Sequence, residues 1–122
     1  MTGFKKYLGP EDRLQIAVNN YLSIAYPKAL FCHVPNEGKR SPFERYKFKE
    51  LGGKAGIPDV LVFTPSKQYS GLAIELKAGR NKPTAKQIEW LDDLKANGWA
   101  SYCLNDFDTI TEIIDKYFKN GL

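Results

Sequence analysis

Two short apolar runs separated by a turn stand in the middle of the chain and limit the folds open to it. Residues 60–64 and 72–78 are rich in large apolar side chains, as strands are. The segment between them contains the turn-forming residues Pro65, Ser70 and Gly71. We therefore expect an antiparallel hairpin, in which successive side chains alternate between two faces.

A helix and another strand follow this hairpin. Thr84 and Gln87 match a capping box that begins a helix, and Gly98 is typical of the position after a helix end. Residues 99–104 form another apolar run. A strand, a crossover helix and a strand make a right-handed unit with parallel strands, so we expect a mixed sheet.

The remaining segments complete the expected architecture. Apolar residues at helical spacing predict a helix over residues 10–25, and residues 29–35 follow as a strand. A capping-box pattern at Ser41 and Glu44 predicts a short helix to about Leu51, and residues 110–118 belong to a last amphipathic helix. We expect an α/β fold in one domain, residues 1–122. Its mixed sheet is flanked by helices in the order α-β-β-β-α-β plus a C-terminal helix.

Composition excludes several classes of protein. With 122 residues, 43% of them hydrophobic, the chain has room for one core and needs no disulfide or structural metal. It lacks both a run of the ~20 apolar residues that span a membrane and the apolar stretch of a signal peptide. Cys32 and Cys103 have no zinc-binding spacing, which predicts reduced packing residues. We expect a soluble, cytoplasmic protein with no membrane partner and no organic cofactor.

The positive charge is concentrated in two segments. The whole chain carries only +4, but residues 37–54 and 77–86 together carry +7, so the other 94 residues carry −3. Such a concentration favours a phosphate-binding surface, although solvated loop lysines would produce the same count. The basic residues of interest are Lys39, Arg40, Arg45, Lys47, Lys49, Lys54, Arg80 and Lys82.

Three charged residues interrupt the two central apolar strands. Glu75 and Lys77 are two positions apart, so they share a face about 6.6 Å apart along the backbone. If Thr64 pairs with Leu72 in the hairpin, Asp59 lies opposite Lys77 and diagonal to Glu75, on that same face. Cross-strand neighbours lie about 5 to 8 Å apart, so the two carboxylates can converge on a hard cation such as Mg²⁺.

This combination suits phosphodiester hydrolysis. A metal lowers the pKa of a bound water and polarises the phosphate, while Lys77 orients the nucleophile or stabilises the added negative charge. The alternative is that all three are ordinary solvated or cross-paired charges. The apolar character of both strands argues against an open solvent face, because central strands are covered on both sides.

These residues resemble a known family. Gly56-x-Pro58-Asp59, a gap, Glu75-x-Lys77 and Gln87 at the next helix are similar to the PD-(D/E)XK nuclease superfamily. More narrowly, the pattern resembles the virus-type replication and repair nuclease (VRR-Nuc) domain in its small stand-alone phage and bacterial form. The resemblance spans residues 11–104 and implies a restriction-endonuclease-like core.

The resemblance also implies roles for individual residues. Asp59 and Glu75 are the metal-binding carboxylates, the Leu76 carbonyl is a further ligand of Mg²⁺ or Mn²⁺, and Lys77 is catalytic. Glu11 matches an acidic position of the metal site and Gln87 a glutamine beside it. Each has an alternative, because Glu11 equally suits the helix dipole and Gln87 the capping box. Asn36 resembles a polar position after the first strand.

The remaining single residues carry weaker signals. His33 is the only histidine, and a packed or hydrogen-bonded side chain is favoured over a general base. Trp90 and Trp99 could stack on bases, but their positions favour core or interface packing.

The substrate expected from this pattern is branched DNA. The basic segments flank Asp59 and Glu75 in sequence, and no base-reading helix or zinc finger is visible, which favours recognition of DNA shape. Cutting a four-way junction symmetrically needs two sites, and the stand-alone members resemble homodimeric Holliday-junction resolvases. The alternatives are a flap, nick or restriction-type endonuclease of the same fold, and a non-catalytic DNA-binding subunit.

Overall fold

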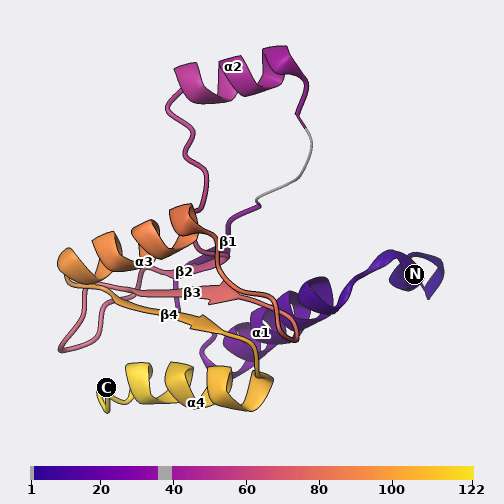
Figure 1. Ribbon diagram of the computed structural model, residues 1–122. Helices are drawn as coiled ribbons and strands as arrows, with labels where there is room; N and C mark the ends of the chain where they lie inside the picture. The colour runs from indigo at the N-terminus through magenta and orange to yellow at the C-terminus, as the bar shows by residue number, and fades with distance from the viewer. Residues whose placement is uncertain (1, 36–39) are drawn as a thin grey trace.

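A four-stranded mixed sheet lies at the centre of the computed structural model, which describes residues 2–35 and 40–122 (Figure 1). The strand order is β1-β2-β3-β4. β1 and β2 pair antiparallel, as do β2 and β3, whereas β3 and β4 are parallel. The bounds are β1 (Phe31–His33), β2 (Val60–Val62), β3 (Leu72–Leu76) and β4 (Ala100–Leu104). The expected α/β class and mixed sheet are confirmed.

Helices lie on both faces of this sheet. Figure 1 shows α3 on one side and α4 on the other, with α1 packed beside α4. The described helices are α1 (Pro10–Ala25), α2 (Pro42–Glu50), α3 (Ala85–Ala96) and α4 (Phe107–Phe118), preceded by a 3₁₀ helix, η1 (Thr2–Tyr7). The sequence patterns did not predict η1. None of these helices is long and apolar enough to cross a membrane.

The main core lies between the sheet and the α1/α4 layer. Leu72, Ile74 and Leu76 of β3 are fully buried there, because every second residue of a strand faces the same side. Val18 and Leu22 of α1 pack into the same cluster, which also contains Val60, Val62, Ala100, Ile110, Ile114 and Tyr117. The intervening β3 residues, Ala73 and Glu75, face the α3 side and are buried as well.

The expected hairpin exists, but its predicted register is wrong by two residues. Val62, not Thr64, pairs with Leu72. Beyond Val62 the chain no longer pairs with β3, and the Thr64 carbonyl instead accepts a hydrogen bond from the Tyr117 hydroxyl (2.7 Å). A shift of two keeps each side chain on its face. Extended by one residue, the register places Asp59 opposite Glu75, not opposite Lys77.

Two further expectations need correction. Cys32 is exposed, because β1 is an edge strand whose second residue faces solvent, whereas Cys103 is half-buried as a packing residue. The short helix predicted after Ser41 is present as α2, with the expected Ser41/Glu44 capping box, but the predicted element order had omitted it.

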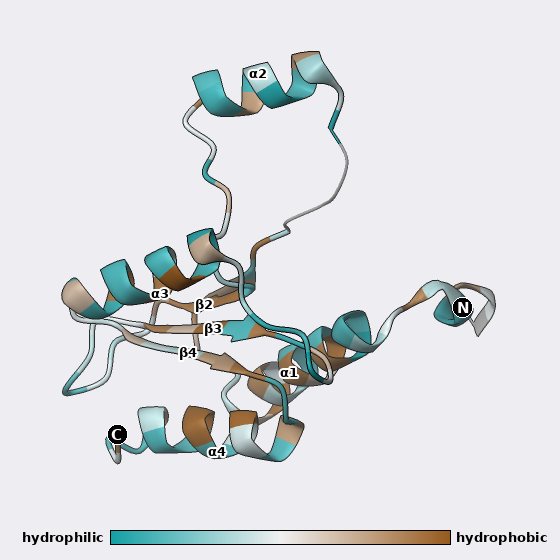
Figure 2. Ribbon diagram, in the orientation of Figure 1, coloured by the Kyte–Doolittle hydropathy of each residue, from teal (hydrophilic) through white to brown (hydrophobic). Residues whose placement is uncertain are grey.

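The α2 helix stands apart from the rest of the molecule (Figures 1 and 2). It has no buried residue, and Figure 2 shows it as mostly hydrophilic. We call residues 40–55, which carry α2 and its flanking segments, the arm. The chain returns from the arm directly into Asp59 and β2.

Candidate active site

The least exposed charged residue of the described chain is Glu75, at the end of β3. Only 1% of its surface is exposed, because neighbouring strands pair with β3 on both sides and helices cover both faces of the sheet. Its Oε2 atom lies 3.5 Å from Lys77 Nζ, whose side chain is 13% exposed. Its Oε1 atom is buried without a hydrogen-bond partner among the described residues.

Burial dominates the electrostatics of this carboxyl. Loss of hydration is the largest cause, Asp59 adds to it and Lys77 opposes it, and together they raise the pKa of Glu75 to about 8. A buried acid that keeps an unpaired oxygen costs stability, so such a group points to a function more than to packing.

Asp59 is held against Glu75 by backbone hydrogen bonds. Its Oδ2 accepts a hydrogen bond from the Leu76 amide (2.8 Å), which fixes the carboxylate beside the end of β3. Its carbonyl accepts one from the Val34 amide (2.8 Å) and lies 3.0 Å from His33 Nδ1. The structure therefore brings together Asp59, Glu75 and Lys77, as the sequence pattern predicted.

Gly56 sets the path by which the chain reaches Asp59. Its φ is +88°, a left-handed conformation in which a side chain is strained. A Cβ at this position would lie 2.9 Å from Lys86 in the first turn of α3. Both constraints require glycine, and they fix the segment before Asp59 against the start of α3.

A cavity of about 430 Å³ opens at this end of the sheet. Asp59 and Leu76 contribute to its wall, and so does Glu11 from the first turn of α1. Glu11 is half-buried, and its Oε2 lies 3.4 Å from Asn81 Nδ2 in the loop after β3. The rest of the wall comes from Leu8, Asp12, Gln15, Ile16 and His33.

Two cavity residues, Gln15 and His33, were missed as site residues by sequence reasoning. Gln15 Oε1 is a second buried oxygen without a partner in the described part of the chain. Its signal was available, since Gln15 follows Glu11 by four residues and so shares its helix face. His33 is hydrogen-bonded, as predicted, but it is exposed and lines the cavity.

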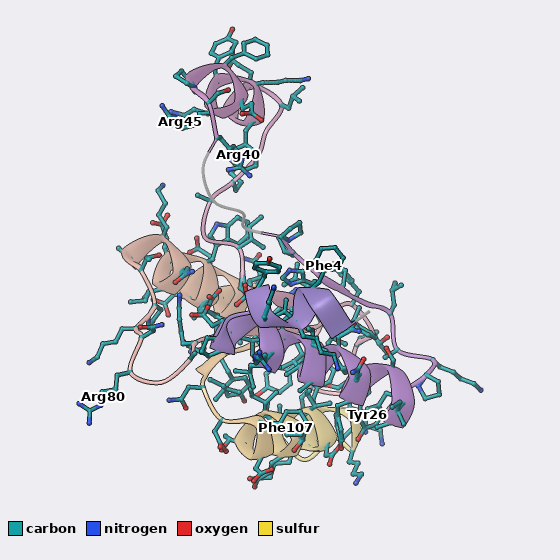
Figure 3. The ribbon with its side chains drawn as sticks, turned by 90° about the vertical axis from the view of Figure 1, so that its right-hand side faces the viewer. Phe4, Tyr26, Arg40, Arg45, Arg80 and Phe107 are labelled. Carbon is teal, nitrogen blue, oxygen red and sulfur yellow. The ribbon has the colours of Figure 1, made fainter. Side chains whose placement is uncertain are left out.

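The other predicted site residues lie elsewhere. Gln87 takes part in the capping box of α3, where its Oε1 accepts a hydrogen bond from the Thr84 amide (2.8 Å). The structure therefore contains the capping role that was the alternative for this residue. Arg80 and Lys82 are exposed in the loop after β3, and Figure 3 shows Arg80 extending away from the body. Asn36 and Lys39 lie outside the described residues. The remaining predicted DNA-binding residues belong to the arm: Arg40, Arg45, Lys47, Lys49 and Lys54.

Comparison with known proteins identifies the class. The family model described as the VRR-NUC domain matches residues 9–105, most of the chain, so the chain belongs to the VRR-NUC domain family. A solved structure described as a VRR_NUC domain protein is similar at 28% identity with a TM-score of 0.75, covering 93% of this chain and 92% of that one.

A second solved structure, described as a VRR_NUC domain, shares the fold at 19% identity with a TM-score of 0.62, covering 90% of this chain and 99% of that one. The curated proteins contain no significant match. Membership of the family implies a nuclease of the PD-(D/E)XK type, and hence DNA binding; such nucleases generally use divalent metals.

The residues present fit a divalent cation. Two carboxylates converge, and the buried Oε1 of Glu75 lacks the partner that a cation would provide. No three His, Cys, Asp or Glu side chains of the described chain gather closely enough to enclose a metal on their own. Such an incomplete protein ligand set suits Mg²⁺, which keeps several of its waters.

Proposed function

We propose that this chain is a metal-dependent, structure-selective DNA endonuclease that hydrolyses phosphodiester bonds, acting as a homodimer on four-way junctions. The observation that carries the proposal is the buried carboxyl of Glu75. It has an unpartnered oxygen, it lies beside Asp59 and it is paired with Lys77. Family membership supplies the reaction class.

Each residue then has a defined task. Asp59, Glu75 and the Leu76 carbonyl would hold Mg²⁺ or Mn²⁺, with Glu11 completing the site directly or through water. A cation held there would supply a water of lowered pKa and would polarise the phosphate. Lys77 places its ammonium where negative charge develops on that phosphate. Gln87 stays a predicted site residue, with its capping role as the alternative.

The arm supports the homodimer. Its helix α2 has nine residues and buries none of them, and isolated helices of that length are marginal in water. Phe43 and Tyr46 are 68% and 62% exposed, and Leu51 is 77% exposed. A second copy that covers these three side chains would stabilise α2 and would provide the second active site that a symmetric junction requires.

The test combines substrate and metal. Purified protein is incubated with a four-way junction, a flap and a linear duplex of equal length, each with Mg²⁺, Mn²⁺ or EDTA. We expect cleavage of the junction with either metal and none with EDTA. Faster cleavage of the flap would instead favour the flap alternative. A protein that binds the junction and leaves it intact with both metals would be a DNA-binding subunit, and the proposal would be wrong.

The oligomeric state is tested separately by analytical ultracentrifugation. We expect a dimer, and we expect Phe43→Ser with Tyr46→Ser to shift it toward monomer. A control double variant, Lys95→Ser with Lys116→Ser, changes two exposed residues outside the arm and should leave the dimer intact. A wild-type monomer at all concentrations would contradict the homodimer.

A further inference from the structure

A second hollow in the molecule lies between the arm and α3, apart from the cavity at Glu11 and Asp59. Its volume is about 690 Å³. We call it the cleft. The arm contributes Arg40, Arg45, Phe48, Lys49, Gly53, Lys54 and Ala55, and α3 contributes Lys86, Glu89, Trp90 and Asp93.

We propose that the cleft binds one unpaired strand of the nucleic-acid substrate, which rests on Arg40 and Trp90 while the basic side chains contact its phosphates. This inference rests on the proposed nuclease function and deepens it. A fully paired junction exposes no single strand, so the cleft would hold nucleotides that unpair at the branch point, next to the scissile bond.

The charge of the cleft favours a polyanion. Five basic side chains line it against two acidic ones, Glu89 and Asp93. The ion pairs found among the described residues join Lys77 to Glu75 and Lys116 to Glu112, so they leave the cleft charges unpaired. Concentrated unpaired positive charge on concave walls attracts phosphate and releases counterions when phosphate binds.

One wall of the cleft is a preassembled flat surface. The Arg40 guanidinium lies 4.0 Å from the centre of the Phe48 ring, and the Arg45 Nη1 donates to the Arg40 carbonyl (3.0 Å). The other neighbour of the Phe48 ring is Gly53, where a Cβ would lie only 2.4 Å from the ring. The packed ring therefore holds a planar guanidinium ready to stack on a base. Figure 3 shows Arg40 and Arg45 on the arm.

Trp90 provides an aromatic group on the other wall. Its Nε1 donates to the Ala55 carbonyl (3.0 Å), which fixes the indole between α3 and the segment returning from the arm. The side chain is half-buried and lines the cleft. Stacking on an aromatic ring does not depend on base identity, so the site would hold a strand without sequence preference.

The cleft has room for part of a single strand. Its volume of about 690 Å³ lies in the usual range of small-ligand sites, about 300 to 1,000 Å³. In a duplex each base is stacked on its neighbours, which hides the faces that Arg40 and Trp90 would contact, whereas unpaired nucleotides expose those faces.

Tryptophan fluorescence tests the stacking directly. The chain has two tryptophans, so Trp99→Phe leaves Trp90 as the only one. Oligothymidylate in EDTA should quench Trp90 fluorescence, and a blunt duplex of equal length should quench it less. Should Trp99→Phe fail to fold, the quenching of wild type and Trp90→Phe is compared instead. Equal quenching by the two ligands, or none, would overturn the inference.

Paired neutral substitutions test the charges. Lys49 lines the cleft and Lys47, on the same helix, does not. Lys49→Gln should lower the salt dependence of oligothymidylate binding by about 0.7 in log–log slope, the value for one phosphate contact on a single strand, and Lys47→Gln should lower it less. Likewise Trp90→Leu should weaken binding more than Phe4→Leu, which changes an exposed aromatic outside both the cleft and the proposed dimer contact. Equal effects within either pair would contradict a specific strand site.

Binding in EDTA separates this inference from the proposed function. If the strand binds through Lys49 and Trp90 but no metal supports cleavage, the cleft stands and the nuclease proposal fails. If the protein cleaves the junction and Trp90→Leu and Lys49→Gln do not alter its preference for the junction over linear duplex, the nuclease stands and the cleft inference is wrong.

Discussion

Two carboxylates, one in α4 and one in the central strand β3, have contrasting surroundings. Asp115, in α4, accepts hydrogen bonds from the hydroxyls of Tyr21 (2.6 Å) and Tyr26 (2.5 Å), which lower its pKa. Glu75, in β3, is buried with one oxygen unpartnered, and its pKa is raised. In Figure 3, the labelled Tyr26, which follows α1, and Phe107, the first residue of α4, mark the region in which α1 and α4 pack together. The hydrogen-bonded carboxylate of Asp115 links α4 to α1, whereas the carboxyl of Glu75, with one oxygen unpartnered, has the character of a ligand-binding group.

Two ion pairs repeat the contrast. Lys116 and Glu112 lie 3.1 Å apart with both side chains more than half exposed, and such pairs contribute little to stability. Lys77 and Glu75 lie 3.5 Å apart with both side chains mostly buried. A buried pair loses hydration that its attraction does not fully return, so its presence here favours a catalytic use.

The largest expected effect is on cleavage. Glu75→Gln should lower the rate by about a thousandfold or more, because it removes a proposed metal ligand. Asp115→Asn, which alters the hydrogen-bonded carboxylate, should retain the wild-type rate. Single-turnover cleavage of the junction measures both. Similar rates for wild type and Glu75→Gln would remove Glu75 from the site.

The lysines of the two ion pairs provide the next test. Lys77→Ala should slow cleavage by about 100-fold to 1,000-fold, the usual cost of losing one group that stabilises charge in the transition state. Lys116→Ala should cleave as wild type does. Rates at saturating substrate distinguish a chemical defect from weakened binding. Equal rates for the two variants would contradict a catalytic role for Lys77.

Metal binding should stabilise only the protein with an intact site. At a Mn²⁺ concentration about 100 times its dissociation constant, the free energy of unfolding should rise by about 2.7 kcal/mol in wild type. Asp59→Asn should show a much smaller rise, and Asp115→Asn the full one. Urea denaturation with Mn²⁺ or EDTA measures the difference. An equal rise in all three proteins would place the metal elsewhere.

Asp115 should contribute to the stability of the metal-free protein. Asp115→Asn should lower the free energy of unfolding by about 1 kcal/mol, because two tyrosine hydroxyls lose a charged acceptor. Since its pKa is lowered in the folded state, this stabilisation exists above the ordinary aspartate pKa and disappears as the pH falls below it. Urea titrations at neutral and acidic pH should show the variant approaching wild type in acid. A deficit that persists unchanged at low pH would argue against an ionic role.

The pH effect of Glu75 should have the opposite sign. Its folded-state pKa of about 8 lies above the ordinary value of 4.5, so between these values only the folded state retains the proton. The free energy of unfolding of metal-free wild type should therefore fall, relative to Glu75→Gln, as the pH rises from about 5 to 8. Parallel curves for the two proteins would show that Glu75 titrates normally.

Most of the elements could be predicted because each has local signals, although the predicted order omitted α2 and no pattern indicated η1. Capping residues at Ser41 and Thr84 begin α2 and α3, and the apolar runs correspond to strands. The hairpin register could not be predicted, since contacts with distant parts of the chain, such as the hydrogen bond from the Tyr117 hydroxyl to the Thr64 carbonyl, end the pairing at Val62 and Leu72. The prediction that Asp59 and Glu75 meet survived this error because a shift of two residues preserves the face.

The basic segments show the same division. Their position around Asp59 and Glu75 was visible in the sequence. Which side chains share one cleft was not, because Arg40, Lys49 and Trp90 line it together only where the arm faces α3. His33 and Gln15 likewise reached the cavity through packing of β1 and α1 against the end of the sheet.

The sequence by itself determined the α/β class and the family pattern. It also determined that Asp59, Glu75 and Lys77 lie on one face of the hairpin, because strand alternation and motif spacing are local properties of the chain. Only the tertiary structure decided how deeply Glu75 is buried and which of its oxygens lacks a partner. It also decided that the chain has a second, basic hollow. Burial and concavity arise from the packing of segments distant in sequence, and no local pattern encodes them.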